Sequence, residues 1–431
     1  MLTNTTNTAT PPTPALETYA RELGENARTA SRALRALPVA KRDAALKALA
    51  AGLLKAQADL LESNAQDIEE GRARGLTAAM LDRLLLTPAR IKNIADNVKT
   101  IASLPDPLGR VLSKRKRKDG LRIERVSVPI GTILFIYESR PNVTIDGGAL
   151  CFKSGNAVIL RGGKEAARTN AAFARVFEAV LESKGLDPRA VQLVREPDHA
   201  LVDLLLADER HIDLVIPRGG ERLIRSVAEK ARMPVIKHYK GLCHIYVDKT
   251  ADIPTAARVA VNAKAQRPGV CNAMETLLLD RRLPPKAVKR ILDALLEHNV
   301  ELRGDGAVRA IHPSVHAAAE SDWGEEYLDL ILSVKMVEGV EGAVEHIARY
   351  GTGHTDAVLA KSPRVQKAFV EGVDSASVMV NASTRFADGE EYGLGAEVGI
   401  STDKLHARGP MGLEALTTYR WIVQGEGHVR G

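Results

Sequence analysis

The chain has 431 residues, 45% of them hydrophobic and 26% charged, as in ordinary globular proteins. Its formal net charge of +6 admits anionic partners. No apolar run approaches the roughly 18 residues that a membrane helix needs, so we expect no membrane partner. The three cysteines lack the spacing of zinc ligands. They predict free thiols, a reducing and cytoplasmic compartment, and no metal site.

Along the chain, the pattern of apolar residues changes from an uncharged lead to a helical region and then to two blocks of alternating strands and helices. Residues 1–14 carry no charge and no apolar segment, and we expect them to be disordered. Residues 15–105 repeat apolar residues at helical spacing, which predicts helices. From about residue 126, the sequence predicts short buried strands that alternate with helices. One of the predicted strands is MPVIKHY (233–239). A second alternating block follows Cys271. This pattern is typical of parallel, doubly wound sheets, so the predicted fold class is α/β.

The densest basic run is Lys114–Lys118, KRKRK, and it has two interpretations. It is either a nucleic-acid-binding patch or the solvated tip of a β-hairpin. Asp119-Gly120 is a turn signal, and LRIERVSV after it alternates as a strand does. No aromatic residues interleave the basic ones for base stacking. The hairpin is therefore favoured, and no nucleic-acid partner is expected.

Two predicted strands end in Gly-Gly turns, each beside an arginine. A strand that turns through glycines into a helix presents backbone N–H groups and a helix dipole to a phosphate. Ordinary loop geometry also explains such turns, and neither matches G-x-G-x-x-G. A phosphorylated ligand and a plain loop both remain open. The residues are Arg161, Gly162, Gly163 and Lys164 in the first turn and Arg218, Gly219 and Gly220 in the second.

Cys271 lies in QRPGVCNAMET, behind an Arg-Pro-Gly turn and ahead of an apolar run. A nearby cation such as Arg267 lowers the pKa of a thiol and produces the nucleophilic thiolate. Gly269 would let the backbone come close to a ligand. The alternative is a structural, half-buried cysteine. Cys151 and Cys243 fit a helix core and a strand core.

Other polar residues interrupt apolar surroundings. Asn142, after Arg140-Pro141, is either an oxyanion donor or a helix N-cap. His346 and His354 receive no catalytic role. Residues 383–412 form a long Gly-rich segment, of a kind that is usually functional. The strand end before it offers a carboxylate-binding site through Asn381, Ser383, Thr384 and Arg385.

Several segments, in this order, resemble the γ-glutamyl phosphate reductase family of the aldehyde dehydrogenase superfamily. The resemblance runs from about residue 15 to 425. The segments include PIGTILFIYESRPNVTIDGGALCFKSGNAVILRGGKEA, PVIKHYKGLCHIYVD, RPGVCNAMETLL, HIARYGTGHTDA, VNASTRFADGEEYGLGAEVGIST and LHARGPMGLEALTTY.

The resemblance implies an NADPH-dependent reduction of L-glutamyl 5-phosphate to L-glutamate 5-semialdehyde through a Cys271 thioester, in the second step of proline biosynthesis. It implies Asn142 as oxyanion donor, and NADPH or NADP near Arg161 and the Arg218–Gly220 turn. Glu326 falls where the superfamily places a carboxylate on the nicotinamide ribose. A homo-oligomer is expected, with the upstream glutamate kinase as a further partner.

The implied fold has a cofactor domain at 15–258, to which about 388–412 returns, and a catalytic domain at 259–387. Residues about 110–132 with 413–431 form the oligomerisation element. Hydrolytic relatives carry a glutamate in an E-L-G-G-K segment, and here the corresponding residues 237–241 read KHYKG. Without that general base, the site suits acyl exchange with phosphate. Candidates for holding phosphate are Lys237, His238, Arg140 and Arg267. A CoA-acylating dehydrogenase remains the alternative.

Overall fold

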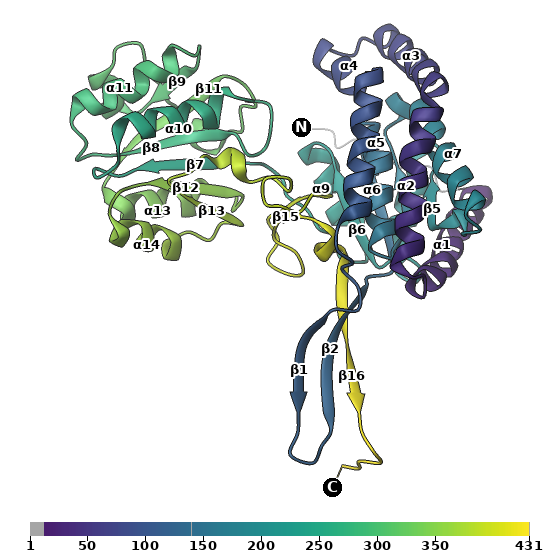
Figure 1. Ribbon diagram of the computed structural model, residues 1–431. Coiled ribbons are helices and arrows are strands. Elements are labelled where there is room, and N and C mark those ends of the chain that lie inside the picture. Colours follow the sequence, from purple (N-terminus) through teal and green to yellow (C-terminus); the bar gives the residue numbers. More distant parts are fainter. Residues whose placement is uncertain (1–12, 139, 431) are drawn as a thin grey trace, which may run out of the picture. The chain divides into compact units, whose positions relative to one another are not determined.

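The computed structural model describes residues 13–138 and 140–430, arranged in two compact units (Figure 1). Unit 1 contains the chain up to Lys237 together with Leu394–Gly399 and Met411–Gly431. Unit 2 contains His238–Gly393 and Ile400–Pro410. Most of the expected disordered segment, residues 1–12, lies outside the described residues. No helix in the described part of the chain is long and apolar enough to cross a membrane.

Unit 1 begins with the helices that the apolar spacing predicted over residues 15–105. The first one starts where Thr13 accepts a hydrogen bond from the backbone N–H of Leu16 and Pro14 takes the first helical position, which needs no donor. Helices α2 and α5 pack closely on each other through buried aliphatic side chains. The five helices are α1 (Pro14–Arg35), α2 (Val39–Lys55), α3 (Gln57–Ala73), α4 (Ala78–Leu84) and α5 (Pro88–Ser103).

The sheet of unit 1 is four-stranded and parallel, in the order β5-β4-β3-β6. Its short, buried, Val/Ile/Leu-rich strands are typical of sheets covered on both faces. The predicted strand at 233–239 is wrong, since only Val235 bridges to β6. The elements are β3 (Thr132–Tyr137), α6 (Asn142–Lys153), β4 (Ala157–Arg161), η1 (Lys164–Ala166), α7 (Ala167–Ser183), η2 (Pro188–Ala190), β5 (Val191–Leu193), α8 (His199–Ala207), β6 (Leu214–Arg218) and α9 (Glu221–Lys230).

A separate antiparallel sheet in unit 1 joins β1 (Val111–Lys116), β2 (Arg122–Pro129) and the C-terminal β16 (Thr417–Gln424). The hairpin interpretation of the basic run is confirmed, with Gly120 at a positive φ of 96° in the turn. The first three basic residues lie on β1 itself rather than at the tip, and Lys114 pairs with Glu124 at 3.2 Å. The sheet exposes large apolar side chains, among them Trp421 at 58%.

Unit 2 is a seven-stranded parallel sheet in the order β10-β9-β11-β8-β7-β12-β13. Its core is built from aliphatic side chains of the central strands and the helices against them. The elements are β7 (Cys243–Val247), α10 (Ile253–Ala265), β8 (Met274–Asp280), α11 (Pro285–Leu296), β9 (Glu301–Gly304), α12 (Gly306–Ile311), β10 (His316–Ala317), η3 (Glu320–Gly324), β11 (Ile331–Val337), α13 (Gly339–Tyr350), β12 (Thr355–Leu359), α14 (Pro363–Gly372) and β13 (Ser377–Val380).

The boundary between the units differs from the expected one after residue 258. It falls after Lys237, because β7 lies between β8 and β12 in the sheet of unit 2 and carries α10 with it. The expected return of 388–412 to unit 1 holds only for Leu394–Gly399, since Ile400–Pro410 belongs to unit 2. The Gly-rich segment 383–412 has little regular structure: η4 (Thr384–Phe386), β14 (Gly399–Ser401) and β15 (Gly409–Met411). The short helix η5 (Leu413–Leu416) follows it.

Candidate active site

Cys271 lies in the turn between α10 and β8, three residues before the strand. All three cysteines are described, and Cys271 alone is partly exposed. Burial raises the pKa of Cys151 and raises that of Cys243 well above its ordinary value, so both stay protonated and unreactive. Of the three thiols, Cys271 is therefore the one with the exposure that a nucleophile needs.

The backbone around Cys271 is held by two residues of the preceding loop and strand. The thiol of Cys243 donates to the Cys271 carbonyl oxygen at 3.2 Å. At Gly241, an added Cβ would lie 1.9 Å from that same oxygen, so no side chain fits there. The N–H of Gly241 donates to Oε1 of Glu326 at 2.8 Å. Glu326 thus holds in place the loop whose residue Gly241 packs against the Cys271 carbonyl group.

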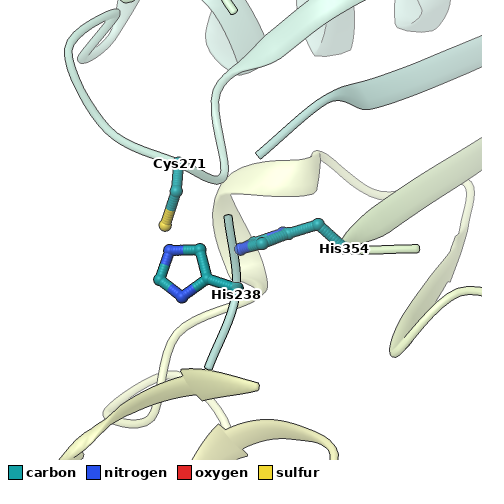
Figure 2. Close-up of side chains that lie close together, drawn as sticks. All are labelled: His238, Cys271 and His354. Carbon is teal, nitrogen blue, oxygen red and sulfur yellow. The ribbon is translucent and has the colours of Figure 1, made fainter. Parts of the chain in front are cut away.

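Two histidines face the Cys271 sulfur, as Figure 2 shows. The sulfur and one nitrogen of each ring, in His238 and His354, all lie within 4.8 Å of one another. The two rings meet edge to face, with centroids 5.7 Å apart. His238, Cys271 and His354 precede β7, β8 and β12, and these three strands are adjacent and parallel. The cluster therefore lies at the amino edge of the sheet of unit 2.

The two imidazoles differ in environment. Nδ1 of His238 donates to the carbonyl oxygen of Ile400 at 2.9 Å. His354 is fully buried, and its Nδ1 lies 2.9 Å from Oγ1 of Thr355. Burial lowers the pKa of His354 to about 3, with the neighbouring His238 as a smaller cause. Nε2 of His354 has no hydrogen-bond partner among the described residues.

Two arginines from different segments, Arg267 and Arg385, interact with each other, and Arg385 also interacts with the thiol. Nε of Arg385 donates to Oε1 of Gln266 at 2.8 Å, next to Arg267 in the sequence. Burial lowers the pKa of Arg385, and the charge of Arg267 lowers it further, whereas the Cys271 thiolate opposes the shift. Asn272 donates to the carbonyl oxygen of Ala387 at 3.0 Å and so ties the cysteine turn to the segment that carries Arg385.

The expected carboxylate-binding residues divide between two tasks. Ser383 caps η4 by accepting from the N–H of Arg385 at 3.3 Å. Both polar groups of the Asn381 side chain bond the backbone of Ala360, at 2.9 and 3.1 Å. Asn381 has a φ of 55° and holds the turn after β13 in place. The Asn381 side chain therefore stabilises the backbone at Ala360, whereas the Arg385 side chain interacts with the Cys271 thiol.

Asn142 belongs to unit 1 and is the first residue of α6, whose N-cap is Pro141 without a side-chain cap. The N-cap alternative is therefore wrong. The side-chain amide instead donates to Oδ2 of Asp146, one turn later, at 2.9 Å. Burial raises the pKa of Asp146 to about 6, and this hydrogen bond acts in the opposite direction. Arg140 lies exposed in the preceding loop.

The first Gly-Gly turn lines a hollow of about 150 Å³ at the carboxyl end of β4. Arg161 is partly buried there and donates to the carbonyl oxygen of Pro197 at 3.2 Å. The second turn follows β6 and does not line this hollow. The N–H of Gly220, at the start of α9, donates to Oε2 of Glu138 at 2.9 Å. A carboxylate of the chain thus occupies this helix start. The hollow is lined by Arg161, Gly162, Gly163, Lys164, Ala167, Asn170, Ala171 and 193–197.

The model of the "Aldehyde dehydrogenase family" matches residues 6–322. The chain belongs to the aldehyde dehydrogenase family. A gamma-glutamyl phosphate reductase of Geobacter metallireducens is 48% identical over 410 residues, covering 95% of this chain and 98% of that one.

Solved structures agree with this aldehyde dehydrogenase assignment. The crystal structure of a gamma-glutamyl phosphate reductase from Thermotoga maritima is 43% identical, with a TM-score of 0.94 over 96% of this chain and all of that one. The corresponding enzyme from Saccharomyces cerevisiae is 30% identical, with a TM-score of 0.53 and coverage of 96% and 98%. An acetylating aldehyde dehydrogenase of Geobacillus thermoglucosidasius, at 16% identity and a TM-score of 0.68 over 97% and 98%, shares the fold.

Within this aldehyde dehydrogenase, sequence reasoning missed three residues around the thiol. In the sequence, Gly241 stands out only as the last residue of KHYKG, His354 carries no signal of a catalytic role, and Cys243 fits a strand core. All three residues lie just before or at the start of strand β7 or β12. This shared position points to a common site only when the strand order is known.

Proposed function

We propose that this chain reduces L-glutamyl 5-phosphate to L-glutamate 5-semialdehyde and releases phosphate, the second step of proline biosynthesis from glutamate. The observation that carries the proposal is the partly exposed Cys271 thiol, which lies in unit 2 with two imidazoles and within electrostatic reach of the Arg385 guanidinium group. The relatives from Geobacter metallireducens and Thermotoga maritima, both named for this reductase activity, support it.

In the first step the Cys271 thiolate attacks the γ-carbonyl carbon. A sulfur–carbon bond forms, the carbon–oxygen bond to phosphate breaks, and phosphate leaves with the electron pair. We assign the Asn142 amide to the developing oxyanion, where one donor is typically worth roughly 3–4 kcal/mol. We propose that Arg267 and His238 stabilise the negative charge of the leaving phosphate. Arg140 and Lys237, both of unit 1, are further candidates for this role.

We assign the α-carboxylate of the substrate to Arg385, whose planar fork binds both carboxylate oxygens. Ser383 contributes by capping η4 and fixing the start of the segment that carries the arginine. Asn381 supports the turn through Ala360 rather than through the substrate. Arg385 can therefore be tested separately from the fold of the loop.

The aldehyde dehydrogenase family uses nicotinamide cofactors, and we propose NADPH and NADP for this chain. We assign the 2′-phosphate of this cofactor to the hollow at the end of β4, because Gly162 and Gly163 admit close backbone approach and Arg161 and Lys164 suit a phosphate group. When bound, the cofactor supplies the hydride that reduces the thioester carbon. Cleavage of the sulfur–carbon bond then returns the Cys271 thiolate.

Two further expected cofactor contacts stay proposals. The first is Glu326 at the nicotinamide ribose, with the carboxylate already oriented by Gly241. The second is the turn of Arg218, Gly219 and Gly220. There Gly220 already bonds Glu138, so we expect the contribution to come from the Arg218 side chain.

We assign cofactor binding to unit 1, catalysis to unit 2, and self-association into a homo-oligomer to the sheet of β1, β2 and β16. The exposed Tyr419, Trp421 and Val423 on β16 support that assignment. Delivery of the acyl phosphate by the upstream glutamate kinase and a cytoplasmic location complete the proposal.

A spectrophotometric assay of the reverse reaction tests the proposed function. Reduction of NADP should require semialdehyde and phosphate together, and omission of either should abolish it. Cys271→Ala should remove turnover and leave nucleotide binding intact, while the matched thiol variant Cys151→Ala should retain it. Turnover by Cys271→Ala, or CoA replacing phosphate, would overturn the assignment in favour of another nucleophile or an acylating dehydrogenase.

A further inference from the structure

We propose that Sγ of Cys271 and the Nε2 atoms of His238 and His354 form a binding site for a divalent cation of the Zn²⁺ class, and that the bound ion withholds the thiolate from catalysis. The binding itself is independent of the proposed function, and only the inhibitory consequence rests on it. No sequence motif indicates this site, because its ligands come from three separate segments around residues 238, 271 and 354.

The first argument is the donor set. A thiolate and two imidazoles within 4.8 Å of one another are the ligands that zinc selects over magnesium or calcium. Three protein ligands leave a fourth position for water, as in catalytic rather than structural zinc sites. The positive charge of Arg385, which interacts with Cys271, weakens the binding of a divalent cation. We therefore expect an ion that exchanges with the medium.

The second argument is the buried, unsatisfied nitrogen of His354. Its Nε2 has no hydrogen-bond partner among the described residues, although the side chain is fully buried. Buried polar atoms are nearly always bonded. Nε2 of His346 is unpartnered too, but among the described residues only His354 belongs to a cluster with a thiol and a second imidazole. Figure 2 shows the ring of His354 directed at His238 and Cys271. An ion at the centre of the cluster would satisfy this nitrogen.

The third argument is the orientation of both rings. His238 donates from Nδ1 to the carbonyl oxygen of Ile400, which leaves the lone pair on Nε2, the nitrogen nearer the Cys271 sulfur in Figure 2. His354 can donate from Nδ1 to Oγ1 of Thr355, which does the same for its own Nε2. Metal-binding histidines are usually oriented by such outer hydrogen bonds.

The size of the cluster allows the ion with a modest contraction. Zinc lies about 2.3 Å from sulfur and about 2.0 Å from nitrogen, so its ligand atoms stand roughly 3.5 Å apart. The present separations reach up to 4.8 Å. Cys271 lies in a turn and is partly exposed, and His238 lies in a loop, so these two side chains can approach the fixed His354.

The decisive experiment measures the alkylation rate of Cys271 by iodoacetamide, with peptide mapping, in a phosphate-free buffer with Zn²⁺ or EDTA. Zn²⁺ should slow alkylation of the wild-type protein at least about tenfold, and EDTA should restore the rate. His354→Gln should lose this protection. His346→Gln is the matched control, since His346 is another buried histidine of unit 2 with an unpartnered Nε2 among the described residues, and it should keep the protection.

A second readout identifies the ligand atoms. Co²⁺ should give a thiolate-to-metal charge-transfer band in the wild-type protein, and Cys271→Ala should lack the band. Equal protection in His354→Gln and wild type, or a band that persists without Cys271, would overturn the site. If the melting temperature shows that His354→Gln is misfolded, His238→Gln takes its place, with the same expected loss. Neither readout uses the reductase reaction, so failure of the proposed function and failure of this site are distinguishable.

Discussion

The ammonium group of Lys264 lies 2.6 Å from Oε2 of Glu275, and both side chains are at most 1% exposed. Lys264 stands near the end of α10 and Glu275 on β8, so the pair brackets the turn that carries Cys271. Burial raises the pKa of Glu275 to about 7 and the ammonium opposes the shift. The 2.6 Å contact has the geometry of a charge-assisted hydrogen bond between two buried groups beside the turn that carries Cys271.

Removing one partner of the Lys264–Glu275 pair should strongly destabilise the folded protein. Lys264→Met leaves Glu275 buried without its cation and should lower the free energy of unfolding by about 3–5 kcal/mol. Replacing both, as Lys264→Met with Glu275→Leu, should recover most of that loss. Urea unfolding measures it, and Lys289→Met, which breaks the exposed pair with Asp293, should cost less than about 1 kcal/mol. Equal losses for the two single variants would contradict the argument.

Asn142→Ala should lower kcat by about two to three orders of magnitude, because it removes one donor from the oxyanion. The affinity for NADP, measured by fluorescence titration, should be unchanged. A near-normal kcat would show that Asn142 serves the fold of α6 through Asp146 instead.

Asp146 predicts a pH dependence of stability. Its pKa in the folded chain is about 6, against 3.8 for the ordinary carboxyl group, so the folded state binds the proton more tightly. The resulting stabilisation is complete below about pH 4 and is lost as the pH rises through about 6, an effect of about 3 kcal/mol. Urea unfolding at several pH values should show this decline in the wild-type protein and a flatter profile in Asp146→Asn. Parallel profiles would refute it.

Arg385→Lys should raise KM for the semialdehyde by roughly 10- to 100-fold, the loss expected for one charged hydrogen bond. The affinity for NADP should not change, because the hollow that we assign to the cofactor lies in unit 1. An unchanged KM for semialdehyde would remove Arg385 from the carboxylate site.

Gly241→Ala should impair catalysis more than folding. The new Cβ would meet the Cys271 carbonyl oxygen at 1.9 Å, so the turn must move, and displacement of a reacting group by about 1 Å can cost 10²-fold in rate. Gly306→Ala is the control, since nothing lies within 4 Å of its Cβ. The measurements are steady-state kcat and the melting temperature of both variants. Normal turnover by Gly241→Ala would contradict the prediction and show that the turn adapts to the new side chain.

Local sequence signals located part of this site and could not locate the rest. The Arg-Pro-Gly turn marked Cys271, and alternation of short strands with helices predicted both parallel sheets. The place of His354 beside the thiol depends on the pairing of β12 with β7, which no local pattern encodes. The boundary after Lys237 was missed for the same reason, since β7 follows unit 1 in sequence but pairs within unit 2. Gly241 reads as an ordinary loop glycine until the Cys271 backbone is placed against it.

The parallel order β8-β7-β12 also bears on when the catalytic centre comes into existence. His238 and Cys271 are synthesised long before His354, and β12 must leave the ribosome before it can dock beside β7. A nascent chain that stops short of His354 therefore carries the Cys271 sulfur without its buried histidine neighbour. During translation, the thiol is open to oxidants and electrophiles before its final surroundings have assembled.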